Sequence, residues 1–182
     1  MKRLHKRIPL LLAIMGLSGI GTSAEEPKTK PATAPQQKIE WLSYDAGLAK
    51  ANRENKPIII DFTASWCGWC KKMERETFVD PRVVRYMREN YVPIKVWGDD
   101  TTRAAMVSHN GERMTQQALS AKVYAVRGYP TFWFLDSQGG RIGPQAGYRA
   151  PDQFLALIEY VGGSHYKTMS YESFLQKRAG KG

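Results

Sequence analysis

The sequence predicts an α/β fold in which helices flank a mixed central sheet. Short apolar runs alternate with stretches of helical periodicity along most of the chain, and the last two apolar runs are separated only by a turn. A Cys-x-x-Cys motif directly follows the first run. Because crossover helices join parallel strands and short turns join antiparallel ones, the sheet is expected to contain both kinds of pairing.

Residues 1–24 have the composition of a secretory signal peptide. The basic residues Lys2, Arg3, Lys6 and Arg7 precede an apolar run from Ile8 to Ile20, and small residues lead up to Ala24. The apolar run is about 13 residues long, whereas a spanning helix needs roughly 20. We therefore expect export and cleavage after Ala24. The alternative is an uncleaved membrane anchor.

The rest of the chain divides by composition. Residues 25–38 contain three prolines and three lysines and almost no large apolar side chain, which predicts a flexible linker. Aromatic and aliphatic residues begin at Ile39, and residues 39–163 suit a single domain with one core. Residues 164–182 are expected to form a C-terminal tail, with a short helix at Tyr171–Lys177.

The formal net charge of +10 falls to about +6 once the signal segment is removed. The remaining basic residues are scattered among acidic ones, and no nucleic-acid recognition motif accompanies them. Nucleic acid is therefore not expected as a partner. Weak attraction to acidic protein or membrane surfaces is the simpler inference.

The elements of the domain are expected in a regular order. Residues 58–62 are almost wholly apolar, which is typical of a strand buried on both faces, and Gly139-Gly140 suits a hairpin turn. Helices are expected at Asp45–Glu54, Lys71–Thr77, Arg82–Glu89, Met114–Val123 and Pro151–Val161. Strands are expected at Ile58–Phe62, Val92–Trp97, Thr131–Leu135 and Arg141–Tyr148.

Residues 98–113 are longer than an ordinary connection between elements. The strands at 58–62 and 92–97 are expected to be parallel, so both end at the same edge of the sheet. This insertion should therefore emerge on the side that carries Cys67. It either contributes to partner choice or is a tolerated surface loop.

Cys67 and Cys70 are the two cysteines of the sequence. A disulfide that closes over two residues gains little from loop closure, so the pair is better explained by chemistry than by stability. Cys67 is expected at a helix N-terminus, where backbone N–H groups and the helix dipole favour a thiolate. We therefore predict that Cys67 is the nucleophile, and that Cys70, one turn further in and more shielded, is the resolving thiol.

Two segments resemble the signatures of the thioredoxin superfamily. Residues 60–71, IDFTASWCGWCK, are similar to its active-site block, and residues 127–131, RGYPT, to its cis-proline motif. The resemblance covers roughly residues 39–162 and implies a thioredoxin-like three-layer fold. Residues 77–81, TFVDP, are closer to the periplasmic DsbD C-terminal domain and its relatives. Trp69 departs from the Gly-Pro dipeptide of thioredoxin, which affects the expected redox potential and not the reaction type.

The resemblance assigns roles to residues outside the cysteine pair. Asp61 matches a buried acid that exchanges a proton with the resolving cysteine, and Lys95 matches a lysine beside that acid. A carboxylate in an apolar strand is costly without a partner or a function, so the alternative is that the two only form an ion pair. Pro130 matches the cis-proline, which brings the backbone of Tyr129 beside the sulfurs, where it can pair with an extended substrate. An ordinary trans proline is the alternative.

Two tryptophans flank the first cysteine. Trp69 lies at the expected start of the helix, so we interpret it as a substrate-contact residue. Trp66 is assigned to the same surface, although tryptophan is more often a core residue. Together with Tyr129 and Pro130, these residues form the expected substrate-binding set.

The expected function is that of an exported, periplasmic thiol:disulfide oxidoreductase acting on protein substrates, more as a reductant than as an oxidant. The redox-active Cys67–Cys70 pair would then need no cofactor. The resemblance implies a membrane electron donor of the DsbD kind, and we expect a monomer. The alternatives are a disulfide-donating oxidase or isomerase and a binding or chaperone module without catalysis. A metal site is disfavoured because one Cys-x-x-Cys supplies two ligands, whereas zinc generally takes four, and neither His109 nor His165 has a supporting spacing.

Overall fold

The computed structural model describes residues 38–180, so the predicted signal segment 1–24 and nearly all of the predicted linker lie outside the described residues. Four strands form the main sheet in the order β2-β1-β5-β6. They are β1 (Ile58–Thr63), β2 (Val92–Trp97), β5 (Thr131–Leu135) and β6 (Arg141–Ala146). β1 is parallel to β2 and antiparallel to β5, which pairs antiparallel with β6. The predicted mixed sheet is confirmed.

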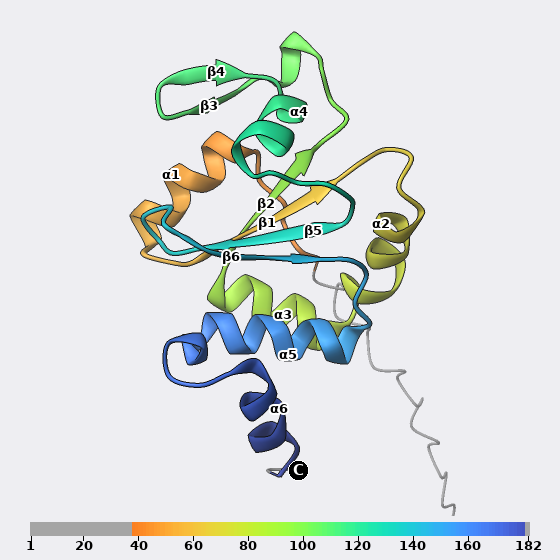
Figure 1. The fold of residues 1–182 in the computed structure, drawn as a ribbon, viewed down its shortest axis with the longest axis vertical. Coiled ribbons are helices and arrows are strands. Elements are labelled where there is room, and N and C mark those ends of the chain that lie inside the picture. The colour runs from red at the N-terminus through yellow and green to blue at the C-terminus, as the bar shows by residue number, and fades with distance from the viewer. Residues whose placement is uncertain (1–37, 181–182) are drawn as a thin grey trace, which may run out of the picture. The chain divides into compact units, whose positions relative to one another are not determined.

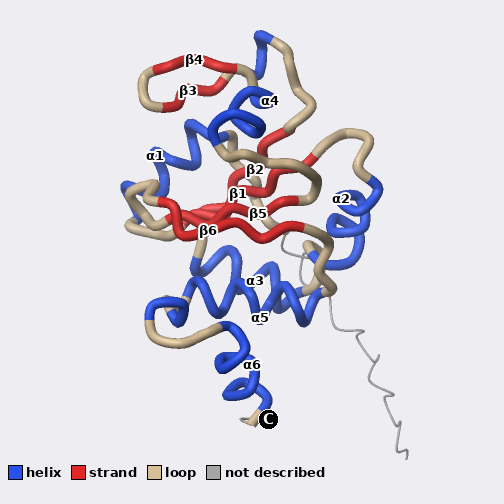
Figure 2. The backbone as a smooth tube through the Cα atoms, viewed as in Figure 1, coloured by secondary structure: helices blue, strands red, loops and turns tan. Residues whose placement is uncertain are grey.

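Helices cover both faces of this sheet, which gives three layers (Figure 1). α3 and α5 lie on one face, and α1 and α4 on the other (Figures 1 and 2). α2 extends from the end of β1 at one edge of the sheet. The α-helices are α1 (Tyr44–Glu54), α2 (Gly68–Lys72), α3 (Pro81–Asn90), α4 (Gln116–Ala118), α5 (Pro151–Gly162) and α6 (Tyr171–Ala179). Shorter helical turns are η1 (Met73–Thr77), η2 (Arg103–Ala105), η3 (Leu119–Val123) and η4 (His165–Lys167).

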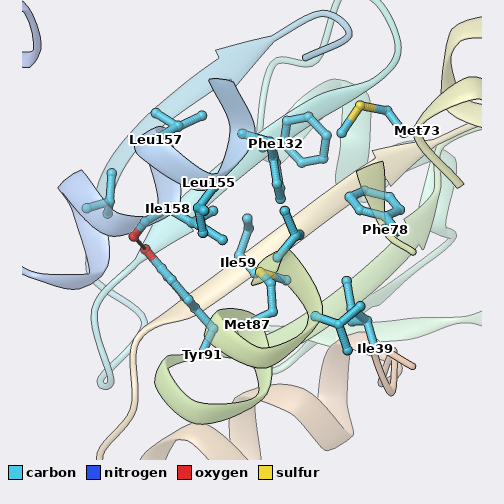
Figure 3. Close-up of a cluster of buried hydrophobic side chains, with 14 of the residues drawn as sticks. Ile39, Ile59, Met73, Phe78, Met87, Tyr91, Phe132, Leu155, Leu157 and Ile158 are labelled. Atoms are coloured by element: carbon cyan, nitrogen blue, oxygen red, sulfur yellow. Dashed lines mark hydrogen bonds between the residues drawn. The ribbon is translucent and has the colours of Figure 1, made fainter. Parts of the chain in front are cut away.

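β1 is the central feature of the core because all six of its residues are buried. Ile58, Ile60 and Phe62 belong to the cluster on the α1 side, whereas Ile59 belongs to the cluster on the α3 and α5 side. This alternation follows from the two-residue period of a strand. Met73, three residues after Cys70, packs in the second cluster with Phe132, and Tyr91 donates a hydrogen bond to the Ile158 carbonyl at 2.8 Å (Figure 3). The core thus fixes the helix that follows the cysteine pair.

The expected helix at Met114–Val123 is wrong at its beginning. Met114 is the last residue of β4 (Glu112–Met114), which pairs with β3 (Val107–His109). The helix starts after Thr115, whose hydroxyl accepts a hydrogen bond from the Ala118 amide at 3.1 Å. A threonine N-cap of this kind stops helical backbone from extending toward the N-terminus. The hairpin was not predicted, because its two strands of three residues carry no clear alternating pattern.

The insertion at 98–113 divides into two parts. Its first residues do lie beside the Cys67 loop, because the Ser65 amide donates to Asp99 at 2.9 Å. The β3–β4 hairpin instead packs on α1, where the Ser108 amide donates to Asp45 at 2.9 Å (Figure 1). The expectation that the insertion emerges on the cysteine side therefore holds for its start and not for its hairpin.

Residues 164–180 pack against the domain. α6 covers the expected Tyr171–Lys177 helix and lies beside α5, on the side away from the sheet (Figure 1). Phe174 is buried, and its ring lies 5.4 Å from that of Tyr160. In the described part of the chain, no helix is long and apolar enough to span a membrane.

Candidate active site

Cys67 and Cys70 are joined in a disulfide at the N-terminus of α2. Cys67 is the N-cap residue of this helix, and its sulfur accepts a hydrogen bond from the Cys70 amide at 3.0 Å. The residues are 3% and 5% exposed, so the expectation that Cys70 is the more shielded of the two is not met in the disulfide state. The two cysteines differ in their position relative to the helix. The Cys67 sulfur lies at the N-terminus of α2, where backbone N–H groups favour a thiolate.

The cis-proline loop lies directly against the cysteine pair. The Tyr129–Pro130 peptide is cis, and Tyr129 packs against the buried cluster of Ala64, Cys67 and Cys70. The Thr131 hydroxyl donates to the Gly128 carbonyl at 2.7 Å, which ties the two ends of this turn together. The two segments identified from the sequence are therefore adjacent in space.

The predicted substrate-contact tryptophans are both exposed, Trp66 by 68% and Trp69 by 58%. The Trp66 ring lies 5.8 Å from the ring of Tyr129 in an edge-to-face arrangement. The ring of Trp69 lies 5.4 Å from that of Tyr148. The structure therefore places one exposed indole beside the cis-proline loop and the other beside the residues that follow β6.

Trp69 belongs to a small cluster of aromatic and charged side chains contributed by α2, η1 and the residues that follow β6. The Lys72 ammonium lies 5.4 Å from the Trp69 ring and 4.7 Å from the Tyr148 ring, within the range of cation–π contacts. The Tyr148 hydroxyl donates to Glu76 at 2.7 Å. Tyr148 was not identified from the sequence. Its place at the end of the expected strand Arg141–Tyr148, which pairs with the strand that follows Pro130, was the available signal.

Asp61 lies in β1, and the structure pairs it with Lys95 of β2, as the resemblance implies. Asp61 is 2% exposed, and the Lys95 ammonium lies 3.7 Å from its Oδ2 atom. Its Oδ1 atom is buried and has no hydrogen-bond partner among the described residues. Lys95 also contacts the carboxylate of Glu74 and lies 4.6 Å from the Trp41 ring. Lys95 therefore connects a buried carboxyl group with an acid at the surface.

Burial raises the pKa of Asp61 to about 7, because the ionised carboxylate loses hydration inside the sheet. The positive charge of Lys95 opposes this rise in pKa, and the negative charge of Glu74 adds to it. A group with a pKa near neutrality exchanges protons readily at physiological pH. The sequence analysis did not identify Glu74 as a site residue, because it resembles an ordinary charged residue on a helix. Its position one turn after Cys70 was the one sequence feature that related it to the site.

Among residues 38–180, no three or more histidine, cysteine or acidic side chains form a group that could hold a metal ion. His109 Nδ1 shares a hydrogen bond of 2.8 Å with the Tyr44 hydroxyl, and the His165 ring packs against Phe174. Both histidines therefore have partners other than the cysteine pair. Within the described residues, the site contains a cysteine pair, a buried carboxyl group and an exposed aromatic surface.

The family described as thioredoxin-like domain matches residues 44–162, a range that contains the cysteine pair, Asp61 and the cis-proline loop. The chain belongs to this thioredoxin-like family. It has the thioredoxin fold, and the two cysteines of its Cys-x-x-Cys motif, Cys67 and Cys70, are joined in a disulfide.

Relatives of this thioredoxin-like chain include the thiol:disulfide interchange protein DsbD. The DsbD of Salmonella typhi is 37% identical over 91 residues, which make up 50% of this chain and 14% of that protein. The DsbD of Yersinia pestis (strain Pestoides F) is 32% identical over 111 residues, or 60% of this chain and 16% of that protein. The chain thus corresponds to a small part of the length of these relatives.

Solved structures show the same fold. A thioredoxin from Thermus thermophilus matches with a TM-score of 0.55 and 27% identity, covering 69% of this chain and 88% of that one. A thioredoxin-fold protein from Helicobacter pylori matches with a TM-score of 0.58 and 20% identity, covering 71% of this chain and 88% of that one. At 20% identity, the second match shows the fold alone.

Proposed function

We propose that this chain is an exported protein-disulfide reductase that works in the periplasm as a monomer. The observation that carries the proposal is Asp61, a buried carboxyl group with a raised pKa on the strand that leads into Cys67. The predicted signal segment 1–24 supports export. The similarity to DsbD supports protein thiols and disulfides as partners and a membrane electron donor of that kind.

The proposed reaction consists of two exchange steps. The Cys67 thiolate attacks a substrate disulfide, which forms a mixed disulfide and releases one substrate thiolate. The Cys70 thiolate then attacks the Cys67 sulfur, forming the Cys67–Cys70 disulfide and releasing the second substrate sulfur as a thiolate, which takes up a proton from water. Asp61 takes the proton that Cys70 loses. Two electrons pass to the substrate, and the disulfide in the structure is the state reached after this transfer.

The charges around the pair support the reducing direction. A strong disulfide donor owes its high potential to a stabilised reduced form, with a very acidic nucleophilic thiol. Here Asp61 lies on β1, the strand that leads into Cys67, Glu74 lies one turn after Cys70, and Lys95 contacts both carboxyl groups. When Asp61 is ionised, the two carboxylates around the single ammonium of Lys95 leave a net negative charge, which opposes thiolate formation and so destabilises the reduced form relative to that of an oxidant.

The proposal is tested by the equilibrium reduction potential of Cys67–Cys70 against glutathione. We expect a value near the roughly −270 mV of thioredoxin and well below the roughly −120 mV of DsbA. An insulin-reduction assay with dithiothreitol, with Cys70→Ser as the control variant, measures catalysis separately. A potential near that of DsbA would make the chain a disulfide donor instead. A low potential without insulin reduction would favour a binding module.

A further inference from the structure

The first residues of the 98–113 insertion contact both β1, which leads to Cys67, and the cis-proline loop. The Gly98 amide donates to the Thr63 carbonyl at 2.8 Å, which continues the pairing of β1 with β2. The Cα atom of Gly98 lies against the side chain of Tyr129, where no side chain at position 98 would fit. Gly98 thus contacts both the strand that leads to Cys67 and the cis-proline loop.

Asp99 holds the loop that precedes Cys67. Its Oδ2 atom accepts two hydrogen bonds from Ser65, from the backbone amide at 2.9 Å and from the hydroxyl at 2.5 Å. Ser65 is followed by Trp66, and the Cys67 amide donates to the Ala64 carbonyl at 3.1 Å, so residues 64–67 form one tight turn. The hydrogen bond from the Ser65 hydroxyl lowers the pKa of Asp99, which therefore stays ionised at neutral pH.

Asp99 is itself held in place by its neighbours. The Asp100 amide donates to the Trp97 carbonyl at 2.9 Å, and the Asp100 carbonyl accepts from the Gln117 amide at 3.0 Å. The side chain of Gln116 accepts from the Trp97 amide at 2.7 Å. These contacts anchor residues 97–100 to β2 and α4, so the backbone that carries the Asp99 carboxylate is held in one position.

We propose that Asp99 is a positioning residue for the exchange reaction, acting through Ser65 to hold Cys67 at the N-terminus of α2. The inference rests on the proposed function and assigns a role to the start of the insertion. Asp99 contacts neither sulfur. Its two hydrogen bonds fix the turn whose last residue is the nucleophile and whose exposed Trp66 lies against Tyr129.

The test uses the purified full chain and three variants. Asp99→Ala removes both hydrogen bonds, whereas Asp99→Asn keeps an acceptor oxygen without the charge. Asp136→Ala is the matched control, because Asp136 also accepts two backbone hydrogen bonds, from Gln138 at 2.9 Å and Gly140 at 2.7 Å, in the β5–β6 turn. Strand register places that turn at the edge of the sheet away from the cysteines.

The first readout is the rate constant for reduction of the Cys67–Cys70 disulfide by dithiothreitol, and the second is insulin reduction. We expect Asp99→Ala to slow both about tenfold, as the loss of two hydrogen bonds to a charged group allows. Asp99→Asn should remain within about threefold of the wild type, and Asp136→Ala within about twofold. The thermal midpoints of Asp99→Ala and Asp136→Ala should fall by similar amounts.

A third readout separates positioning from charge. The pH dependence of Cys67 alkylation by iodoacetamide in the reduced protein gives the thiol pKa. A loosened turn moves the sulfur away from the helix N–H groups, so this pKa should rise in Asp99→Ala and stay near the wild-type value in Asp99→Asn. Loss of a nearby negative charge alone would lower it in both variants and would overturn the positioning role.

The outcomes also distinguish this inference from the proposed function. If the wild type reduces insulin and Asp99→Ala has the same rate constants as the wild type, the positioning role is overturned and the proposed function is not. An equal slowing in Asp99→Ala and Asp136→Ala does the same, because it reports only lost stability. A wild type that does not reduce insulin overturns the proposed function, and the inference falls with it.

Discussion

At the residue scale, Asp61 stands out because its titratable carboxyl group is almost completely buried and its Oδ1 atom has no hydrogen-bond partner within residues 38–180. Its strand neighbours are apolar, and it shares the face of the sheet occupied by Ile59. Lys95 offsets part of the desolvation cost, as its 3.7 Å separation from the carboxyl group shows. A carboxyl group kept in such a place lowers stability unless it is protonated.

We therefore predict that Asp61→Asn stabilises the oxidised protein, and that the gain depends on pH. The pKa of Asp61 is about 7 in the folded protein, whereas the ordinary value for an aspartate is 3.8, so folding favours the protonated form. The stabilising contribution of Asp61 is complete below pH 4 and is lost as the pH rises through 7. The difference in unfolding free energy between variant and wild type should grow over this window, to at most about 4 kcal/mol.

Denaturant unfolding of both oxidised proteins at several pH values between 4 and 8 measures this difference. Asp45→Asn, at an exposed position of α1, is the control. A constant difference between Asp61→Asn and wild type from pH 4 to 8 would contradict the raised pKa.

At the element scale, α3 shows how strongly local chemistry sets a boundary. Asp80 is its N-cap and accepts hydrogen bonds from the amides of Arg82 at 2.9 Å and Val83 at 3.4 Å. Pro81 occupies the first turn, where its missing N–H costs nothing. The Arg82 guanidinium contacts Asp80 and Asp152 at 2.8 Å each, which links this helix start to α5.

Asp80→Ala should lower the free energy of unfolding by about 1 to 2 kcal/mol, the usual cost of losing an N-cap. Thermal or denaturant unfolding of the oxidised protein gives the value. The rate of disulfide reduction by dithiothreitol should not change, because the side chain of Asp80 contacts Arg82 and Val83 and neither cysteine. Asp152→Ala removes the exposed ion pair with Arg82 and a favourable negative charge in the first turn of α5, so it should cost less than about 1 kcal/mol. Equal losses in both variants would refute the capping role.

At the scale of the whole molecule, residues 164–180 extend the domain beyond the expected boundary at 163. Phe174 anchors α6 through the ring of Tyr160 at 5.4 Å and that of His165 at 4.9 Å. Arg178 adds an ion pair with Glu159 of α5 at 2.7 Å. The C-terminal helix thus packs on a layer that already covers the sheet, far from the cysteine pair (Figure 1).

Phe174→Ala should therefore cost about 3 kcal/mol of stability, as expected for removal of a buried aromatic ring. Leu175→Ala, at a neighbouring position that is 39% exposed, should cost less than about 1 kcal/mol. Both variants should reduce insulin at the wild-type rate. Denaturant unfolding followed by fluorescence gives the two free energies, and a negligible effect of Phe174→Ala would show that α6 does not contribute to the folded unit.

The sequence by itself determined where the four strands of the main sheet and most helices lie along the chain, and which cysteine pair forms the chemical centre. The apolar run at 58–62 and the proline at the start of α3, Pro81, are local patterns. The two strands of the β5–β6 hairpin and α5 can likewise be predicted from their own segments. Cys67 and Cys70 are neighbours in the chain, so their spacing already specified a disulfide at a helix start. The partnership of Asp61 with Lys95 and the cis bond before Pro130 came from the resemblance of two short motifs.

Only the tertiary structure decided which distant residues complete the site. Asp99 reaches Ser65 across 34 positions, and Glu74 meets Lys95 across 21, because parallel strands and a crossover helix bring them to one edge. The β3–β4 hairpin and the packing of α6 likewise depend on surfaces supplied by α1 and α5. Such contacts follow from chain topology and burial, and no periodicity within a single segment records them.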